Sequence, residues 1–414
     1  MSTTRQRLTL IAALYVSQAI PLGFFVVALP AILRAQGLGL ERVGLLGALA
    51  LPWLVKFLWA PLVDRFGSRR RGHYRSWILP LQSLSVLTVL ALSGLDPSSG
   101  LPWLLIAGAL FMLLSATQDV ATDGLAVRSL DYAERGPGNG IQVGGYYVGQ
   151  ILGGGLMLVL FERFGWGAAL LVMAGLLALP LAPAWRFREP AHRRRDPARA
   201  QKVDFGAMRR FFARPGAGVW VLTLVLYRAG DAMALTMVNP LLVDRGLTLA
   251  QIGFLMGLVV SLAALAGSIA GGALVASLGR KTSLALFGLL QAASTCGYLL
   301  LAAGRVEPLV LYPVVSAAAF AGGMATAALY TNMMDRSDPD TAATDFSLQQ
   351  SLCAVGPLLG STLSGVSAAR LGYGGHFVLC AAVASAGAAL VAWRLTASTA
   401  APRLDAAVLG DLQG

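Results

Sequence analysis

Apolar residues follow one another in long runs along the whole chain, and short polar segments separate these runs. A helix needs about 20 residues to cross the ~30 Å hydrocarbon core of a membrane, whereas a barrel strand needs only about 9–11. Six runs of helical length occur first, at Leu8–Pro30, Val43–Val63, Trp77–Leu95, Pro102–Val127, Gly140–Phe161 and Gly167–Trp185. Six more follow, at Gly216–Val238, Gln251–Ala276, Ser283–Ala303, Leu309–Met334, Thr344–Ala369 and Gly374–Trp393. The pattern predicts an all-α membrane protein with twelve transmembrane helices.

The overall composition agrees with this pattern and excludes most soluble classes of protein. Of the 414 residues, 56% are hydrophobic and 13% are charged, whereas soluble domains carry about 25% charged residues. The three cysteines, Cys296, Cys353 and Cys380, lie in apolar stretches without C-x-x-C spacing. A disulfide framework and a cysteine metal site are therefore not expected.

The net charge of +12 is distributed unevenly over the predicted loops. Alternate loops, the two tails and the central segment hold 24 of the 32 basic residues, and the opposite loops hold six. Lys56 and Arg228 are the two that fall inside predicted spans. Because cytoplasmic loops carry the excess of Lys and Arg, we expect both termini in the cytoplasm and no nucleic-acid partner.

The two halves of the chain repeat one another. The pattern G-L-x-L-x-x-[V/I]-G occurs at Gly37–Gly44 and again at Gly246–Gly253, 209 positions later, and opens the second span of each half. The prediction is a six-helix bundle over residues 1–185, a basic cytoplasmic linker over 186–215, a second bundle over 216–394 and a cytoplasmic tail over 395–414. The linker is expected to set topology, with binding of anionic lipid or nucleic acid as the alternative. Two parallel repeats allow one half to rock against the other.

A charged motif follows the second predicted span. It comprises Asp64, Arg65, Gly67, Arg69 and Arg70. The second half has a partial copy in which Ala276 stands in place of the acid. An acid beside arginines at a helix end can pair with the opposite half, so we expect a latch that closes the cytoplasmic face. The alternative is a tight turn that only carries topology-setting charge.

Charged residues inside the spans are functional candidates, because an ionised side chain in a membrane costs a few kcal/mol and usually faces a pathway or a partner. Asp119 and Asp123 stand at i and i+4, on one face of the fourth span. Lys56 and Asp119 both lie about 10–12 Å from the cytoplasmic end, at ~1.5 Å per residue. The two form either a proton-coupling or substrate-binding site, in which protonation of Asp119 releases Lys56, or a static ion pair that orients two helices. Asp123 is nearer the cytoplasm and is expected to be wetted or linked to the latch.

Arg228 and Asp231 form a second charged pair, at i and i+3 of the seventh span. They can satisfy one another, which is the simplest explanation for both. Transporters also build binding sites at the interface between their repeats, so Arg228 could bind a carboxylate or phenolate of an anionic substrate.

Other polar residues inside the spans are candidates for lining a substrate cavity. They are Tyr15, Gln18, Gln118, Gln142, Tyr146, Tyr227, Asn239, Asn332 and Gln349, with Tyr147 and Gln350 as neighbours of the same kind. Each could instead join two helices by a hydrogen bond. Three widely separated histidines and the lack of a G-x-x-x-x-G-K-[S/T] motif favour no metal site, catalytic triad or nucleotide site. We expect the proton gradient as the energy source, with no cofactor.

Three segments resemble known transporters. Asp64 to Arg70 is similar to the signature of the major facilitator superfamily, although Ala60 replaces its first glycine. Gln118–Gly124 resembles the branch that contains AmpG-type muropeptide permeases and acetyl-CoA transporters. Chain length and the Lys56–Asp64 segment are more similar to siderophore permeases of the RhtX/FptX type, the group of the ferripyochelin permease.

This resemblance implies a single-component permease, not an enzyme, in a bacterial inner membrane. The expected substrate is a ferric siderophore of the pyochelin kind, imported from periplasm to cytoplasm by a monomer. The alternatives are a permease for muropeptides or other amphiphiles, a siderophore or drug exporter, and a membrane sensor that transports nothing.

Overall fold

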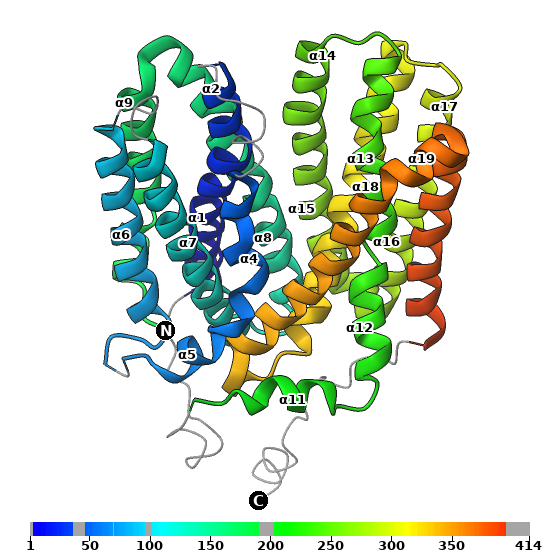
Figure 1. Ribbon diagram of the computed structural model, residues 1–414. Coiled ribbons are helices and arrows are strands. Elements are labelled where there is room, and N and C mark those ends of the chain that lie inside the picture. The colour runs from blue at the N-terminus through cyan, green and yellow to red at the C-terminus, as the bar shows by residue number, and fades with distance from the viewer. Residues whose placement is uncertain (1–2, 36–45, 69, 96–100, 190–202, 395–414) are drawn as a thin grey trace, which may run out of the picture.

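Helices account for nearly all of the chain that the structure describes. The computed structural model describes residues 3–35, 46–68, 70–95, 101–189 and 203–394 (Figure 1). Within these residues, β-structure is limited to one isolated bridge between Ser68 and Gly72. The all-helical class predicted from the hydrophobic pattern is therefore confirmed for the described residues.

The first half of the chain forms helices α1 to α10. α1 (Thr4–Gly23) continues through a π-helical turn (Phe24–Ala28) into α2 (Leu29–Ala35). A 3₁₀ turn (Leu46–Ala50), α4 (Leu51–Val55), a second 3₁₀ turn (Lys56–Leu58) and α5 (Ala60–Arg65) follow. The others are α6 (Arg75–Ser93), α7 (Leu101–Ser129), α8 (Arg135–Gln150), a π-helical segment (Ile151–Leu156), α9 (Met157–Ala178) and α10 (Leu181–Arg186).

The second half forms helices α11 to α19. It opens with α11 (Gly206–Phe212), α12 (Ala217–Leu226) and α13 (Ala229–Asp244). Next come α14 (Leu249–Phe254), a π-helical turn (Leu255–Val259), α15 (Val260–Leu278), α16 (Arg280–Thr295) and α17 (Tyr298–Ala302). The last are α18 (Pro308–Asp335), a 3₁₀ turn (Pro339–Thr341) and α19 (Ala342–Arg394).

Nine helical segments among the described residues are long and apolar enough to cross a membrane. Two of them, Arg135–Arg186 and Pro339–Arg394, contain 52 and 56 residues, more than twice the ~20 that one crossing needs. Each is interrupted by a glycine in the left-handed region, Gly165 at φ 81° and Gly372 at φ 67°, which other residues rarely adopt. Figure 1 shows α19 rising, bending and descending. The count of twelve crossings stays a prediction.

The second predicted span, Val43–Val63, is wrong as a single helix, and its first three residues lie outside the described part of the chain. Val55 has backbone angles outside the helical region (φ −102°, ψ 6°). Trp59 lies at the edge of that region (φ −108°, ψ −1°). Pro52 and Pro61 each lie in the first turn of a new short helix, where the amide hydrogen that proline lacks is not needed. Lys56 therefore lies at a break inside the bundle.

The seventh predicted span, Gly216–Val238, is broken in a comparable way. α12 ends at Leu226 and α13 begins at Ala229, with Arg228 between them at φ −109° and ψ −2°. The two basic residues inside the predicted spans, Lys56 and Arg228, thus both lie where a helix is interrupted. Interruptions of this kind often mark functional positions in membrane helices.

The helices form two groups that meet along α8 and α15. Figure 1 shows α1–α10 on one side of the molecule and α12–α19 on the other. α5, α11 and the first turn of α19 lie together at one end, where α1 also begins and α19 also ends. This end, called the arginine-rich end below, carries Arg65, Arg75, Arg128, Arg135 and Arg214.

Glycines allow the two groups to approach closely. A Cβ atom on Gly140 of α8 would lie 2.7 Å from the carbonyl oxygen of Ser268, and one on Gly136 would lie 2.6 Å from that of Gly272. Small residues permit such backbone contact between membrane helices. These positions therefore set the distance between the halves.

We expect Gly140→Ala to lower the thermal unfolding midpoint of the purified protein in detergent. The added Cβ meets backbone atoms of α15 that cannot rotate away, and overpacking costs about 1–3 kcal/mol. Gly155→Ala is the matched control, since a Cβ there has no described atom within 4 Å and alanine favours a helix. An equal drop in both variants would show that the contact between α8 and α15 has no specific effect.

Candidate functional site

A cavity of about 460 Å³ lies between the two groups of helices. This volume falls in the range of about 300–1,000 Å³ that is typical of small-molecule sites. Its lining residues are Tyr15, Gln18, Ala19, Trp53, Lys56, Asp119, Gln142, Val143, Tyr146, Tyr147, Arg228, Leu235, Thr326, Tyr330 and Gln350. Both halves contribute, so a solute bound here contacts both.

Lys56 is the central cation of this cavity. Its side chain is 2% exposed, and Nζ forms an ion pair with the carboxylate of Asp119. The same Nζ donates a hydrogen bond to Oε1 of Gln350, which belongs to α19 in the other half. Trp53, three residues earlier in the chain, places its ring 5.4 Å from Nζ. The Lys56 ammonium group thus joins the two halves through direct contacts.

Asp119 and Asp123 lie on the same face of α7 and share this cation. Gln18 donates a hydrogen bond to Oδ1 of Asp119. Asp123 accepts hydrogen bonds at Oδ1 from the Tyr15 hydroxyl at 2.8 Å and from Nε2 of Gln142 at 3.0 Å. Its Oδ2 lies 3.6 Å from Lys56 Nζ and accepts no hydrogen bond from the described residues. Two buried carboxylates therefore face one ammonium group.

The expectation that Asp123 is wetted or linked to the latch is wrong. Its side chain is fully buried, at 0% exposure, beneath Tyr15 of α1 and Gln142 of α8. Counting residues along α7 places Asp123 nearer the arginine-rich end than Asp119, but the count cannot show which side chains of other helices cover it. Asp123 belongs to the Lys56 cluster.

Arg228 is the second cation of the cavity. Its Nη2 lies 3.2 Å from Oδ2 of Asp231, and its Nη1 donates to the Thr326 hydroxyl at 2.6 Å. The side chain of Arg228 is 24% exposed, and its Nε is a buried donor without a hydrogen-bond partner among the described residues. Asp231 therefore satisfies only part of the guanidinium group, which leaves donors for an anionic solute.

Aromatic rings form much of the remaining wall. Tyr146 and Tyr147 pack edge to face with ring centroids 5.5 Å apart, and Tyr330 of α18 faces the cavity from the other half. Trp53, Thr326 and Tyr330 were not predicted as cavity residues. Trp53 could have been found, because it precedes Lys56 by one helical turn. Thr326 and Tyr330 lie in an apolar run, and its sequence does not indicate which face of the helix lines a cavity.

Four of the nine predicted cavity residues line this cavity: Tyr15, Gln18, Gln142 and Tyr146. The other five are not among its lining residues: Gln118, Tyr227, Asn239, Asn332 and Gln349. Asn239 is exposed on α13. Gln118 is buried and precedes Asp119 in α7, but it does not line the cavity.

The remaining three join helices to one another. The Tyr227 hydroxyl donates to the carbonyl oxygen of Leu284 at 2.6 Å. Asn332 donates to the carbonyl oxygen of Arg280 in α16 at 3.3 Å, as well as to that of Ala328 in its own helix at 2.9 Å, and Gln349 accepts from Nε1 of Trp220 at 2.7 Å. Hydrogen bonding between and within helices, the alternative explanation of these polar residues, applies to all three.

Asp64 bridges the two halves at the arginine-rich end. Its Oδ1 accepts from the backbone amide of Ala343 at 3.1 Å, and its Oδ2 accepts from the amide and hydroxyl of Thr344 at 2.8 and 2.6 Å. The carboxylate of α5 thus caps the N-terminus of α19, whose amides have no intrahelical partner. The bridge across the halves is made to two backbone amides and one hydroxyl.

Tyr74 supports this bridge from the first half. Its hydroxyl donates to Oδ1 of Asp64 at 2.7 Å. Burial and, secondarily, the negative charge of Asp64 raise the pKa of Tyr74 well above its ordinary value, so the hydroxyl stays protonated and remains a donor. Arg128 lies over the Tyr74 ring at 4.7 Å and donates to the carbonyl oxygen of Pro339, another contact between the halves, at 2.8 Å.

The other residues of the charged motif that begins at Asp64 have different surroundings. Arg65 lies 5.4 Å from the ring of its neighbour Phe66, Arg70 is exposed, and Arg69 lies outside the described residues. Gly67 packs so closely on His73 that a Cβ atom would overlap the imidazole ring. Gly67 therefore fits the tight turn, while Asp64 makes the bridge.

A second bridge replaces the acid that the repeated motif lacks at Ala276. Asp335, the last residue of α18, accepts from Nε of Arg280 at 2.6 Å within its own half. It also accepts from Nη1 of Arg135 at 2.9 Å, and Arg135 begins α8 in the other half. The Asp335 side chain is fully buried. Together with Asp64, this carboxylate holds the two halves in contact at the arginine-rich end.

Comparison with known proteins finds relatives along most of the chain. The profile of the Major Facilitator Superfamily matches residues 11–361. The chain is 29% identical over 377 residues to the anhydromuropeptide permease of Escherichia coli (strain K12), which covers 91% of this chain and 77% of that protein. It is 24% identical over 382 residues to a Rickettsia felis protein named as transporter AmpG 4, covering 90% and 92%. The crystal structure of the human organic anion transporter MFSD10 (TETRAN) has the same fold, with a TM-score of 0.71 at 16% identity over 94% of this chain and 100% of that one.

We expect Asp64→Ala to open the arginine-rich end more often. Loss of a helix cap costs about 1 kcal/mol, which corresponds to roughly a fivefold change in population. The measurement is the reaction of an impermeant maleimide with Ala19→Cys, a cavity position, in inside-out vesicles of a variant whose Cys296, Cys353 and Cys380 are serines.

Asp131→Ala is the control, because the Asp131 side chain is 81% exposed at the same end. The labelling rate should rise several-fold in Asp64→Ala and stay unchanged in Asp131→Ala. Equal rates in Asp64→Ala and the parent protein would contradict a latch at Asp64.

Proposed function

Because the chain belongs to the Major Facilitator Superfamily, we propose that it is a proton-coupled permease that imports an acidic amphiphile of the muropeptide class across a bacterial inner membrane. The observation that carries this proposal is the cavity between the halves, which is lined by two cations, the carboxylate of Asp119 and several tyrosines, with the buried carboxylate of Asp123 beside Lys56. The permease works by alternating access, as one bundle rocks against the other.

The proposed topology has twelve spans with both termini in the cytoplasm. It divides the chain into bundles over residues 1–185 and 216–394, joined by the linker over 186–215 and followed by a tail over 395–414. Counting Arg135–Arg186 and Pro339–Arg394 as two crossings each, and the short helical stretch Leu46–Leu58 as part of one more, gives twelve. The basic residues concentrated at the arginine-rich end support the placement of this end in the cytoplasm.

The charge balance of the buried cluster supports proton coupling. Lys56 supplies one positive charge, whereas Asp119 and Asp123 supply two negative charges if both are ionised. A net charge buried inside a membrane protein is costly, so the two carboxyl groups share one proton in this state. A second proton that reaches Asp119 would neutralise it and release Lys56.

The release of Lys56 would change a contact between the two halves. Lys56 Nζ holds Asp119 in its own half and Gln350 in the other. A change in the protonation of Asp119 therefore alters a contact between the halves directly. The same movement must break the bridges of Asp64 and Asp335 at the arginine-rich end before the cavity can open there.

The substrate class follows from the lining residues and from the relatives. Arg228 offers donors to a carboxylate, Gln142 and Gln350 can pair with amides, and the tyrosine rings can pack against sugar faces. A muropeptide combines these three groups. The resemblance to an anhydromuropeptide permease over 91% of the chain supports this class over the siderophore that the sequence segments favoured.

A ferric siderophore of the pyochelin kind is the second candidate. The specific observation in its favour is the aromatic wall of Trp53, Tyr146, Tyr147 and Tyr330, which suits a compact aromatic chelate. Arg228 would then bind the carboxylate or phenolate of that chelate. A negatively charged siderophore would bind the same residue, Arg228, as a muropeptide carboxylate. Transport measurements therefore decide between the two substrates.

Transport into proteoliposomes under an imposed proton gradient tests the substrate. We expect labelled anhydromuropeptide to accumulate and a radioiron-labelled ferric siderophore to stay at background. Accumulation of the siderophore alone would overturn the muropeptide proposal in favour of the second candidate. Movement only outward would indicate an exporter, and no movement of either solute would favour a sensor.

Arg228→Gln should raise the KM for the acidic solute about tenfold or more, because a hydrogen bond to a charged group contributes roughly 1.5–3 kcal/mol. Arg245→Gln is the control, since Arg245 is exposed at the end of the same helix α13. Initial rates over a range of solute concentrations give the KM. An unchanged KM in Arg228→Gln would show that Arg228 binds no substrate charge.

Asp119→Asn and Lys56→Met should each abolish accumulation driven by the proton gradient while leaving solute exchange across the membrane in place. Exchange needs the halves to rock but moves no net proton. Thr117→Val, on the same helix α7 but partly exposed, is the matched control and should behave as the parent protein. If both variants accumulate solute normally, Lys56 and Asp119 form a static ion pair.

A further inference from the structure

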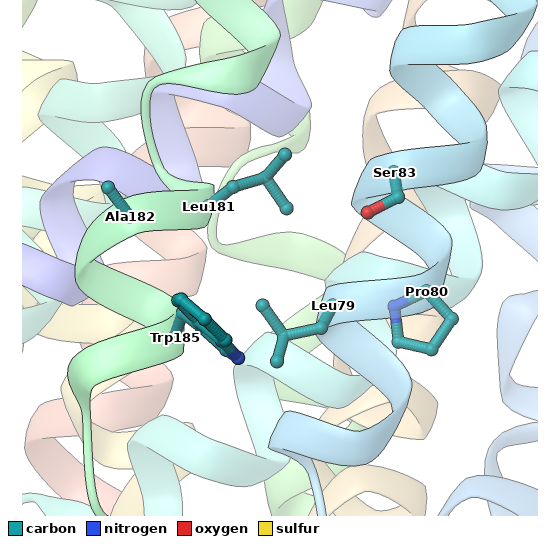
Figure 2. A pocket seen from close by; sticks show the side chains of 6 residues that line it. All are labelled: Leu79, Pro80, Ser83, Leu181, Ala182 and Trp185. Atoms are coloured by element: carbon teal, nitrogen blue, oxygen red, sulfur yellow. The ribbon is translucent and has the colours of Figure 1, made fainter.

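A hollow lies on the outer surface of the first bundle, away from the central cavity. It has a volume of about 510 Å³ and is lined by Leu79, Pro80, Ser83, Leu181, Ala182 and Trp185. Figure 2 shows these side chains on α6 and α10, with Leu79 and Leu181 directed into the space between the two helices. None of the six lines the central cavity. The solute pathway therefore leaves this hollow unexplained.

The hollow lies at the depth of the lipid head groups and the first acyl carbons. Leu79 is four residues after Arg75, the first residue of α6, which corresponds to about 6 Å along a helix. On the other wall, Trp185 belongs to the last turn of α10, is 74% exposed and precedes Arg186. Tryptophan and arginine at a helix end are typical of a membrane interface.

Arg75 contacts the wall of the hollow through the backbone of Trp185. Its guanidinium group donates to the carbonyl oxygen of Trp185 and, at 3.4 Å, to that of Arg71, so it spans from α6 to α10. Its Nε is buried and donates no hydrogen bond to the described residues. This donor lies at the junction of an apolar wall and a basic surface.

The charge around this junction is positive. Arg71, Arg186 and Arg188 are exposed near it along the chain, in addition to Arg75 itself. The nearby carboxylate of Glu189 is engaged by the backbone amides at the start of α6, at 3.0 Å and 3.1 Å. Four arginines thus oppose one carboxylate, which favours a negatively charged head group.

We propose that this hollow binds a single anionic phospholipid of the leaflet at the arginine-rich end. One acyl chain lies along Leu79, Pro80, Leu181 and Trp185, and the phosphate receives the hydrogen bond from Arg75. The lipid would fasten α10, the last helix before the linker, to α6. Its binding is independent of which solute the cavity carries.

Native mass spectrometry of the full chain in neutral detergent tests this proposal. The protein is titrated with phosphatidylglycerol and, separately, with phosphatidylcholine of the same acyl chains. We expect one phosphatidylglycerol to bind with a midpoint at least about fivefold lower than that of phosphatidylcholine, the effect of about one interfacial arginine. Arg75→Gln should remove this preference, and Ala182→Trp, which fills the hollow, should weaken both lipids.

Matched controls come from the last turns of α19, at the same end of the molecule. Arg394 and Ala386 are exposed there and lie outside the hollow, so Arg394→Gln and Ala386→Trp should leave both midpoints unchanged. Equal midpoints for the two lipids in the parent protein would overturn the proposal, as would equal losses in test and control variants. A dimer that Ala182→Trp dissociates would instead assign the hollow to a second copy of the chain. If Arg75→Gln does not fold, Ala182→Trp still decides between these outcomes.

Discussion

The ammonium group of Lys56 is the interaction on which the rest of the site depends. It is buried, it forms an ion pair with Asp119, it lies 3.6 Å from Asp123, and it donates across the molecule to Gln350. A buried ion needs partners on every side, because losing one leaves an uncompensated charge at a cost of about 3–5 kcal/mol. The position of α7 relative to α19 is therefore linked to the charge of two carboxyl groups.

The contacts at the arginine-rich end are suited to breaking and reforming. Asp64 binds the free amides of α19, a cap that contributes about 0.5–2 kcal/mol, and Asp335 joins Arg135 to Arg280. Neither bridge needs to be strong, because both act in parallel with the glycine contact of α8 and α15. A transporter requires states of similar free energy, and many modest contacts give a closed state that a bound solute and a proton can shift.

The sequence was informative wherever one helix decides the outcome and uninformative where several helices meet. The depths of Lys56 and Asp119 could be counted along their own spans, and the structure places them in contact. The burial of Asp123 could not be counted, because side chains from α1 and α8 cover it. Gln349 and its neighbour Gln350 differ by about 100° around one helix. Because of this rotation, the first packs inside its bundle and the second faces the cavity.

The proton that we propose Asp119 and Asp123 to share can be tested for by infrared spectroscopy of the purified protein at neutral pH. We expect the parent protein to show a protonated carboxyl band that exchanges slowly in deuterated water. Either Asp119→Asn or Asp123→Asn should remove the band, since the remaining carboxylate then pairs with Lys56 and holds no proton. A parent spectrum without this band, or one identical to those of both variants, would contradict the shared proton and with it the proposed coupling.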